Sequence, residues 1–291
     1  MKNSDILNIP AETYHADPCP EPSLSASVAI TLIQKSPLHA WTAHPKLNPD
    51  YEPKVADQFD LGSAAHNMVL RQEYWREDIR VVDAADWRTK PAKEAKEAAR
   101  AAGEHPVLRP QYEALNRMVS ALERHPRASR AFRDGAPERT LVWRDADTGV
   151  WMRCRPDWMP DDHSVPWPDY KTTRLDPKGW DRWFTTGKLG MLRAAFYEAG
   201  IRATTGIEMP TIYYVVQEMD PPHAVWVRVV EPDSAFMKVG RAMLRKAVRT
   251  WAECLSKDRW PSYDLVGTLD LPEWAENRMF IQYADDMEQP Q

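Results

Sequence analysis

The sequence predicts one α/β domain with a helical N-terminal region. Apolar residues recur every three or four positions up to about residue 136, and from Leu141 onward they alternate with a period of two. The 291 residues contain no repeat and no Gly-rich linker, and 43% of them are hydrophobic. We therefore expect a single domain over 25–260, made of a helical part (25–136), a core (137–230) and a C-terminal helix (232–255).

The first 60 residues combine an arm with a short helix. Four prolines favour an extended N-terminal arm over residues 1–24, namely Pro10, Pro18, Pro20 and Pro22. Ser25 is a typical N-cap for the apolar stripe that follows it, and Pro37 is expected to end this helix.

A second helix is expected over 59–71. Its buried side would carry Leu61, Ala65, Met68 and Val69, and small residues would let it approach another backbone closely.

Two more helices complete the helical part. Residues 91–102 are rich in Ala, Glu and Lys and carry hardly any large apolar side chain, so we expect an exposed helix there. Residues 110–124 place Tyr112, Leu115, Val119 and Leu122 at helical spacing, which predicts an amphipathic helix with one buried face.

The core is expected to alternate strands and helices. A strand begins at 141–143, a turn at 147–149 reverses the chain, and strands over 150–158 and 165–172 follow. Helices are expected over 177–185 and 188–199, and further strands over 212–216 and 224–230.

The C-terminal helix, 232–255, is interpreted as scaffold. It carries an apolar stripe that we expect to pack in the core: Phe236, Val239, Met243, Ala247, Trp251 and Cys254. The tail, 261–291, bears acidic residues near its end (Asp285, Asp286 and Glu288) and is expected to be partly disordered or to form an oligomer contact.

Charge and cysteine content exclude several classes of protein. A net charge of −5 argues against a protein that simply coats nucleic acid, although residues 171–193 carry six basic and two acidic side chains, a local charge of +4. Cys19, Cys154 and Cys254 are too few for a four-thiolate cluster and are interpreted as packing residues. No apolar run approaches the roughly 20 residues of a membrane span, and the first residues lack signal-peptide order. We expect a cytoplasmic protein without a membrane partner.

The most informative pattern combines two aspartates and a lysine. Asp169 and Lys171 are expected on one face of a strand, with Tyr170 on the other face, because side chains alternate. By the same rule Arg153, Arg155 and Asp157 share a face of the neighbouring strand. If the two strands pair, two carboxylates and one ammonium converge.

A convergent carboxylate pair is typical of a site for a hard divalent cation, and Mg²⁺ suits it because Mg²⁺ takes oxygen ligands and substrate phosphate. Such a cation would polarise a scissile phosphate and acidify a water, while Lys171 would orient or help deprotonate that water. The alternative is a surface ion-pair network in which Asp157 and Asp169 simply meet Arg155 and Lys171.

Other candidates are weaker by themselves. His66 lies on an expected helix, where a lone histidine is more often a packing residue than a ligand. Glu138 precedes an expected strand and is either an acidic ligand, a water binder or an exposed charge. His39 and His44 have no cysteine or carboxylate at zinc-like spacing, so a zinc site is not expected.

Several motifs follow one another in a fixed order: Tyr14-His15; Leu24-Ser25 with Ser36-Pro37-Leu38-His39; Gly62-Ser63-Ala64-Ala65-His66; Arg155-Pro156-Asp157-Trp158; Asp169-Tyr170-Lys171-Thr172-Thr173; and Ala195-Phe196-Tyr197. This order resembles the RecE-type exonucleases, the catalytic domain of exodeoxyribonuclease VIII of phages and prophages, within the PD-(D/E)XK nuclease superfamily. The resemblance covers about residues 9 to 200 and implies a restriction-endonuclease-like mixed central sheet flanked by helices.

The resemblance also implies roles for individual residues. His66, Asp157 and Asp169 would bind Mg²⁺, with Mn²⁺ as a substitute, and the carbonyl of Tyr170 would add a ligand. Lys171 would be the catalytic lysine. Glu138 would occupy the acidic position that precedes the core strands and is counted among the catalytic candidates.

The family reaction is 5′-to-3′ digestion of linear double-stranded DNA by phosphodiester hydrolysis. It is performed by ring-shaped homo-oligomers, and the usual partner is a single-strand annealing recombinase. The resemblance therefore implies a role in phage-type homologous recombination.

One departure from the family pattern concerns the covering helix. A glutamine commonly lies four residues before its tyrosine, whereas here Arg193 precedes Tyr197. A guanidinium is well suited to contact a phosphate. The side chains expected to contact DNA are Ser25, Lys35, Ser36, Arg155, Thr172, Arg174, Arg193 and Tyr197. For Ser25, Lys35 and Ser36 the alternative is helix capping alone.

Two other functions stay open. An endonuclease could be built on the same fold, and a recombination accessory could bind DNA ends without cutting them. An iron–sulfur nuclease is disfavoured by the three scattered cysteines.

Overall fold

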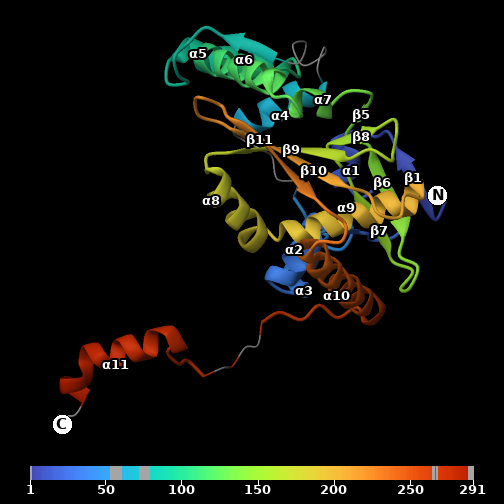
Figure 1. The fold of residues 1–291 in the computed structure, drawn as a ribbon, viewed down its shortest axis with the longest axis vertical. Helices are drawn as coiled ribbons and strands as arrows, with labels where there is room; N and C mark the ends of the chain where they lie inside the picture. The colour runs from blue at the N-terminus through green and yellow to red at the C-terminus, as the bar shows by residue number, and fades with distance from the viewer. Residues whose placement is uncertain (1, 53–60, 72–78, 264–265, 267, 288–291) are drawn as a thin grey trace.

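A mixed sheet lies between helical layers in the computed structural model, which describes residues 2–52, 61–71, 79–263, 266 and 268–287 (Figure 1). The strands are β1 (Ser4–Leu7), β2 (Leu24–Ser25), β3 (Ile79–Val82), β4 (His105–Leu108), β5 (Gly135–Pro137), β6 (Thr140–Arg144), β7 (Trp151–Cys154), β8 (Trp158–Pro160), β9 (Trp167–Thr173), β10 (Ile212–Glu218) and β11 (Val225–Val230). The helices are α1 (Ala11–His15), α2 (Ala26–Gln34), α3 (Pro37–Thr42), α4 (Leu61–Arg71), α5 (Lys90–Ala101), α6 (Arg109–Arg124), α7 (Ala128–Ala131), α8 (Pro177–Arg182), the π-helical turn η1 (Trp183–Gly187), α9 (Gly190–Thr205), α10 (Ala235–Lys257) and α11 (Glu273–Met287).

The strand pairing is both parallel and antiparallel. β10 runs parallel to β9 and antiparallel to β11. A second sheet has the order β1-β6-β7-β2, in which β2 is parallel to β7 and the other pairs are antiparallel. The predicted α/β fold with a mixed sheet flanked by helices is therefore confirmed.

Each face of β9 and β10 packs on its own set of helices. Alternation along β10 places Tyr214 and Val216 in the larger hydrophobic core, which α2, α9 and α10 complete. Tyr170 and Val215 point to the opposite face, where they pack against α4, α6 and α7. Because both faces are covered, β10 can carry its nearly continuous apolar run.

Helix α9 is held tightly between the sheet and α10. At Gly240 of α10 an added Cβ would lie 2.1 Å from the carbonyl oxygen of Met191, so only glycine permits this close crossing. Leu189, the residue immediately before α9, has φ 48° and turns the chain into this helix. This close packing fixes the direction in which α9 presents Arg193 and Tyr197 to the sheet.

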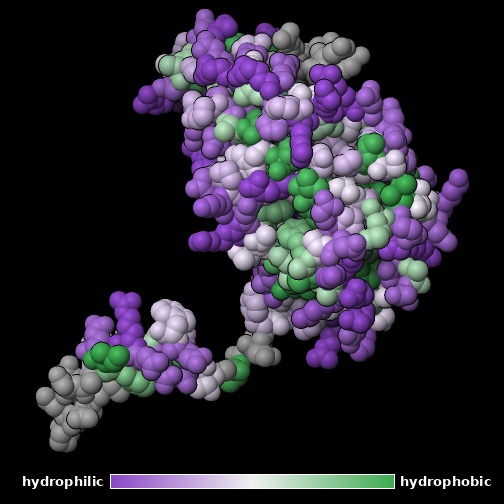
Figure 2. All heavy atoms as spheres, viewed as in Figure 1, coloured by the Kyte–Doolittle hydropathy of each residue, from purple (hydrophilic) through white to green (hydrophobic). Residues whose placement is uncertain are grey.

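Most predicted helices form with small shifts in their ends. The hydroxyl of Ser25 accepts from the N–H of Val28 at 3.4 Å and caps α2 as expected. Ala65, Met68 and Val69 of α4 are buried as predicted, whereas residues 59–60 and the side chain of Leu61 lie outside the described part of the chain. Figure 2 shows mainly hydrophilic side chains over α5 and α6, in agreement with an exposed helix at 91–102.

The prediction of an extended arm is wrong in part. Residues 4–7 form β1, which pairs with β6, and residues 11–15 form α1. The prolines fall between these elements, so they leave both free to form. The helix after Ser25 ends at Gln34, two residues sooner than predicted, and Ser36 caps the separate helix α3.

Three further predictions need correction. The strand expected over 150–158 breaks after Cys154, and β8 then pairs with β5. The helix expected over 177–185 continues as a π-helical turn after Arg182. Val239 is 47% exposed because the buried face of α10 runs instead through Met237 and Gly240.

The tail forms a helix, which the sequence did not predict. α11 spans Glu273–Met287 and stands away from the rest of the molecule in Figure 1. Trp274 and Ile281 on it are 79% and 82% exposed. The side chains of Asp285 and Asp286 and all of Glu288 lie outside what the structure describes. Among the described helices, none is both long enough and apolar enough to cross a bilayer.

Candidate active site

The candidate site begins on β9, the edge strand of the sheet β11-β10-β9. Asp169 lies opposite Tyr214 of β10 in the strand register. Tyr170 points to the other face, as predicted, and its hydroxyl donates to Oε1 of Gln217 at 2.6 Å. Gln217 in turn donates to the carbonyl of Met118 at 2.8 Å. These bonds fix the rotation of β9, so that Asp169 and Lys171 face away from α6.

Asp157 reaches β9 from a loop and not from a paired strand. It lies between β7 and β8, and Oδ2 of its carboxylate accepts from the backbone N–H of Tyr170 at 2.7 Å. The predicted strand pairing is therefore wrong, although the two carboxylates do converge. The free edge of β9 supplies the N–H group that holds the Asp157 carboxylate in place.

Arg153 and Arg155 do not share a face with Asp157. Arg153 is buried on β7 and binds Ser23 and Asp17 near the N-terminus. Arg155 donates to the carbonyl of Ile9 at 2.8 Å. The chain bends at Asp157, so the alternation expected of one continuous strand does not apply.

Lys171 lies between the two aspartates. Its Nζ is 3.3 Å from Oδ2 of Asp157, contacts Oδ1 of Asp169, and donates to the carbonyl oxygen of Tyr170 at 3.1 Å. Burial lowers the pKa of the Lys171 ammonium, but the charges of Asp157 and Asp169 outweigh burial and raise it. Lys171 therefore stays protonated between the carboxylates.

The two carboxylates differ in their proton affinity. Burial raises the pKa of Asp157, yet the charges of Lys171 and His66 and its hydrogen bonds lower it far below the usual value. Burial and the neighbouring charge of Asp157 raise the pKa of Asp169 instead. The difference between the two carboxylates has a structural basis. Buried Oδ2 of Asp169 has no hydrogen-bond partner among the described residues, whereas Oδ2 of Asp157 accepts from a backbone N–H.

His66 reaches the site from α4, which packs on the face of β9 that carries Tyr170. Its Nε2 lies 3.1 Å from Oδ2 of Asp157, and its ring is 6.3 Å from that of Tyr170. Burial lowers the pKa of His66, but the charge of Asp157 and the hydrogen bond to it outweigh burial and raise it. The buried Ala64 and Ala65 bring α4 close to β9, as the small residues predicted.

Three side chains enclose Asp169 from the other side. Burial lowers the pKa of the Arg193 guanidinium, but the neighbouring Tyr197 and the charge of Asp169 outweigh burial and raise it. Burial and the charge of Asp169 raise the pKa of Tyr214 well above its usual value, and its buried hydroxyl has no partner among the described residues. Tyr214 is not among the residues expected from the sequence, because its place opposite Asp169 depends on a strand register that alternation alone cannot supply.

These residues fit a hard divalent cation. Asp157 and Asp169 offer carboxylate oxygens, the carbonyl of Tyr170 points to the same place, and one oxygen of Asp169 is buried without a partner. Within the described residues no three His, Cys, Asp or Glu side chains stand at metal-binding spacing, and Lys171 contacts both carboxylates. The ammonium of Lys171 must therefore move aside for a cation to take its place.

Glu138 lies outside this cluster. Its carboxylate is 3.4 Å from Nη2 of Arg155, and its backbone N–H donates to the carbonyl oxygen of Asp157 at 3.0 Å. Glu138 has φ 51°, which turns the chain between β5 and β6. Its contacts therefore connect it to the Asp157 loop through the backbone and to Arg155 through its side chain.

The expected DNA contacts differ in accessibility. The hydroxyls of Ser25 and Ser36 are buried and cap α2 and α3, whereas Lys35 is exposed. Thr172 is half-buried and Arg174 is exposed, 3.9 Å from Asp220. Lys35 and Arg174 are thus the most accessible of these candidates.

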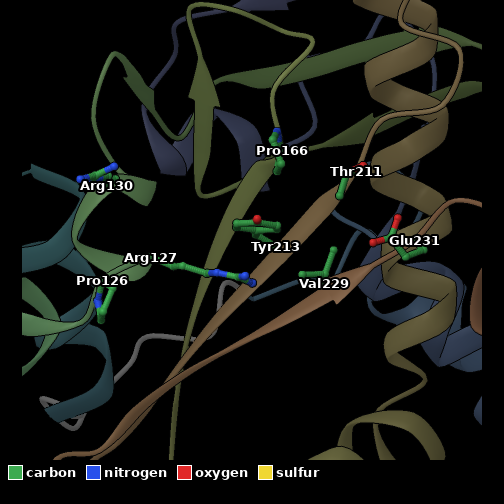
Figure 3. Close-up of a pocket in the computed structure, with 8 residues that line it drawn as sticks. All are labelled: Pro126, Arg127, Arg130, Pro166, Thr211, Tyr213, Val229 and Glu231. Carbon is green, nitrogen blue, oxygen red and sulfur yellow. The ribbon is translucent and has the colours of Figure 1, made fainter.

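One cavity lies elsewhere, on the face of the sheet that carries Tyr170. It has a volume of about 580 Å³, and Figure 3 shows the side chain of Arg127 extending across it toward Tyr213 and Val229. Tyr213 lies opposite Pro168 in the register, so its side chain and that of Asp169 point to opposite faces. This cavity is not part of the candidate site.

Comparisons with known proteins agree with this fold. The PDDEXK-like domain of unknown function, DUF3799, matches residues 27–270. No curated protein sequence matches the chain. The fold is similar to a crystal structure from Eubacterium rectale named "putative exonuclease", with a TM-score of 0.56 and 11% identity, covering 94% of this chain and 98% of that chain. At this identity the similarity concerns the fold alone.

Proposed function

The chain belongs to the PDDEXK-like domain family, and from this premise we propose that it is a Mg²⁺-dependent exonuclease that degrades linear double-stranded DNA from an end. One observation carries the proposal: at the edge of β9 two buried carboxylates meet one lysine, and an oxygen of Asp169 is buried without a partner. A fully paired structural ion network would not leave this oxygen unsatisfied.

The residues of this site have distinct roles in hydrolysis. A bound Mg²⁺, or Mn²⁺ in its place, supplies Lewis acidity toward the scissile phosphate and toward a water. Asp157 and Asp169 hold the cation, with the carbonyl of Tyr170 and with His66, whose Nε2 is 3.1 Å from Asp157. Lys171, once displaced from between the carboxylates, orients the water and offsets negative charge that builds on the phosphate.

Substrate contacts extend outward from this centre. Arg193, which neighbours Tyr197, contacts a backbone phosphate in place of the family glutamine, because its guanidinium presents several donors to phosphate oxygens. Lys35 and Arg174 add exposed positive charge. Glu138 acts through Arg155 and through the backbone of Asp157.

Direction, assembly and biological role rest on the sequence resemblance. We infer 5′-to-3′ digestion, a homo-oligomeric ring around the DNA, and a single-strand annealing recombinase as partner in phage-type recombination. The name of the structurally similar Eubacterium rectale protein supports an exonuclease.

Digestion of matched DNA substrates tests this proposal. With Mg²⁺, the wild type is expected to release nucleotides from linear duplex DNA, more slowly from 3′-labelled than from 5′-labelled ends, and to leave covalently closed circular DNA intact. Lys171→Ala is expected to cleave about 10²–10³-fold more slowly. Lys93→Ala, which removes an exposed lysine on α5, is the matched control. Cleavage of circles would show an endonuclease. Binding of DNA ends without cleavage under any divalent cation would show a non-cutting accessory.

A further inference from the structure

The segment that follows the catalytic strand exposes a tryptophan. After β9 the chain forms α8 and then the π-helical turn η1, where Trp183 is 42% exposed. π-helical turns are rare and often occur at functional sites. In Figure 1, α8 projects beside the sheet on the same side as the start of α9.

Trp183 is presented by a firmly anchored turn. On the inner side of this segment Trp180 and Phe184 are buried and stacked at a ring distance of 4.6 Å. The ring of Phe184 also packs at 4.7 Å from Tyr214, which lies opposite Asp169 in the register. The exposed indole is therefore adjacent in sequence to a side chain that touches the wall of the candidate active site.

Two polar contacts fix the outer side of the same segment. Arg228 of β11 binds Asp181 through two hydrogen bonds of 2.8 and 3.1 Å. Gln34 of α2 donates to the carbonyl of Gly187 at 2.9 Å. Holding the turn at both ends reduces the entropy that Trp183 would lose when it stacks on a ligand.

The surroundings of Trp183 are basic. The ammonium of Lys188 lies 5.3 Å above the indole ring, and Lys178 and Arg182 are exposed on the same segment. In the part of the chain that the structure describes, these three cations have no acidic partner within ion-pair distance. An exposed aromatic ring among unpaired cations is the combination that binds single-stranded nucleic acid, because bases stack on the ring while phosphates meet the cations.

We propose that Trp183, with Lys178, Arg182 and Lys188, is a binding platform for single-stranded DNA beside the active site. This proposal rests on the proposed function and specifies the part of the substrate involved. Unpaired bases are required for more than end contact, since the bases inside a duplex are stacked on both sides and offer no free face to the indole. The platform would hold the strand that hydrolysis leaves behind.

Fluorescence anisotropy with the full chain in EDTA tests the platform without cleavage. The probes are a labelled oligothymidylate and a blunt duplex of equal length. Trp183→Ala is expected to weaken oligothymidylate binding about 10-fold, within the range of roughly 1–3 kcal/mol that one base stack contributes. Blunt-duplex binding should change less than about 2-fold, and Trp183→Phe should keep most of the affinity.

Trp274→Ala is the matched control, because Trp274 is also an exposed tryptophan but lies on α11. It should bind both probes like the wild type, and equal thermal midpoints of all variants would show that the fold is intact. Unchanged oligothymidylate binding by Trp183→Ala would overturn the proposal, and so would an equal loss for both probes. Loss of binding to oligothymidylate alone, in a protein that never cleaves DNA, would support the platform while refuting the exonuclease.

Discussion

Two buried aspartates in this molecule differ in the hydrogen bonding of their carboxylate oxygens. Near the N-terminus, Asp17 accepts from the N–H and hydroxyl of Ser23 at 2.8 and 2.7 Å and lies 3.2 Å from both His44 and Arg153. At the edge of β9, Oδ2 of Asp169 has no hydrogen-bond partner among the described residues. Both carboxylates are buried, so the difference lies in what surrounds them.

The surroundings of Asp17 are those of a structural residue, and the surroundings of Asp169 are those of a candidate reactive residue. Both oxygens of Asp17 are satisfied, and its contacts tie the N-terminal segment to β7 and to the loop after α3. The carboxylate of Asp169 instead keeps an unsatisfied oxygen, which costs stability unless a ligand completes it. A histidine and a basic side chain beside a buried aspartate therefore do not by themselves indicate an active site. The hydrogen-bond partners of each carboxylate oxygen must also be known.

The largest predicted effect is on stability, at the N-terminal cluster. Asp17→Asn should lower the free energy of unfolding by about 3–5 kcal/mol, because it leaves the buried charge of Arg153 without its partner. Asn accepts the φ of 67° at this position, so the backbone is not the cause. Urea denaturation measures the change, and cleavage per folded molecule should be unaffected. Asp147→Asn, at an exposed turn residue, should leave stability unchanged.

The next effect is on catalysis, at the edge of β9. Lys171→Ala should lower the single-turnover cleavage rate by about 10²–10³-fold, the typical cost of losing one electrostatic group at a reacting phosphate. Its stability should fall less than that of Asp17→Asn, since Lys171 is partly exposed. A rate equal to that of Lys93→Ala would show that Lys171 belongs to a structural network.

The third prediction concerns acid stability. Although burial raises it, the hydrogen bond from His44, the charge of Arg153 and the hydrogen bonds of Ser23 lower the pKa of Asp17 to about 2. A carboxyl with a depressed pKa stabilises the fold at a pH above its unfolded value near 4, and this contribution of about 2 kcal/mol is lost as the pH falls to about 2. The difference in the free energy of unfolding between wild type and Asp17→Asn, measured with urea, should be about 2 kcal/mol smaller at pH 2 than at pH 6. Parallel profiles would contradict the assignment.

The smallest effect is expected at Tyr214. Because its hydroxyl has no partner among the described residues, Tyr214→Phe should change the free energy of unfolding by less than about 0.5 kcal/mol. The rate should nevertheless fall several-fold, since Tyr214 lies opposite Asp169 in the strand register. A stability loss without a rate loss would place Tyr214 in the packing alone.

Local patterns predicted much of the fold. Helices α5 and α6 and strands β9 and β10 lie close to the expected positions, because their periodicity is set by nearest neighbours. The pairs β3-β4 and β5-β8 were missed, since each is only three or four residues long and depends on a distant partner. The break in the strand at Asp157 was not predicted either, because the alternation of side chains continues across it in the sequence.

The same distinction applies to the candidate site. Asp157, Asp169 and Lys171 were expected together, and the structure brings them together by an N–H bond from Tyr170 and not by strand pairing. Tyr214 could not be predicted, because its proximity to Asp169 follows from parallel register. The partners of Asp17 come from three separate segments, around Ser23, His44 and Arg153, and no spacing in the sequence connects them.

Binding of Mn²⁺ tests whether the edge of β9, with its unsatisfied Asp169 oxygen, holds a divalent cation. Calorimetric titration of the full chain without DNA should show saturable binding to the wild type and at least about 10-fold weaker binding to Asp169→Asn, within the range expected for loss of a group that supports a metal. Asp17→Asn should bind like the wild type. Equal affinity of wild type and Asp169→Asn would contradict the account.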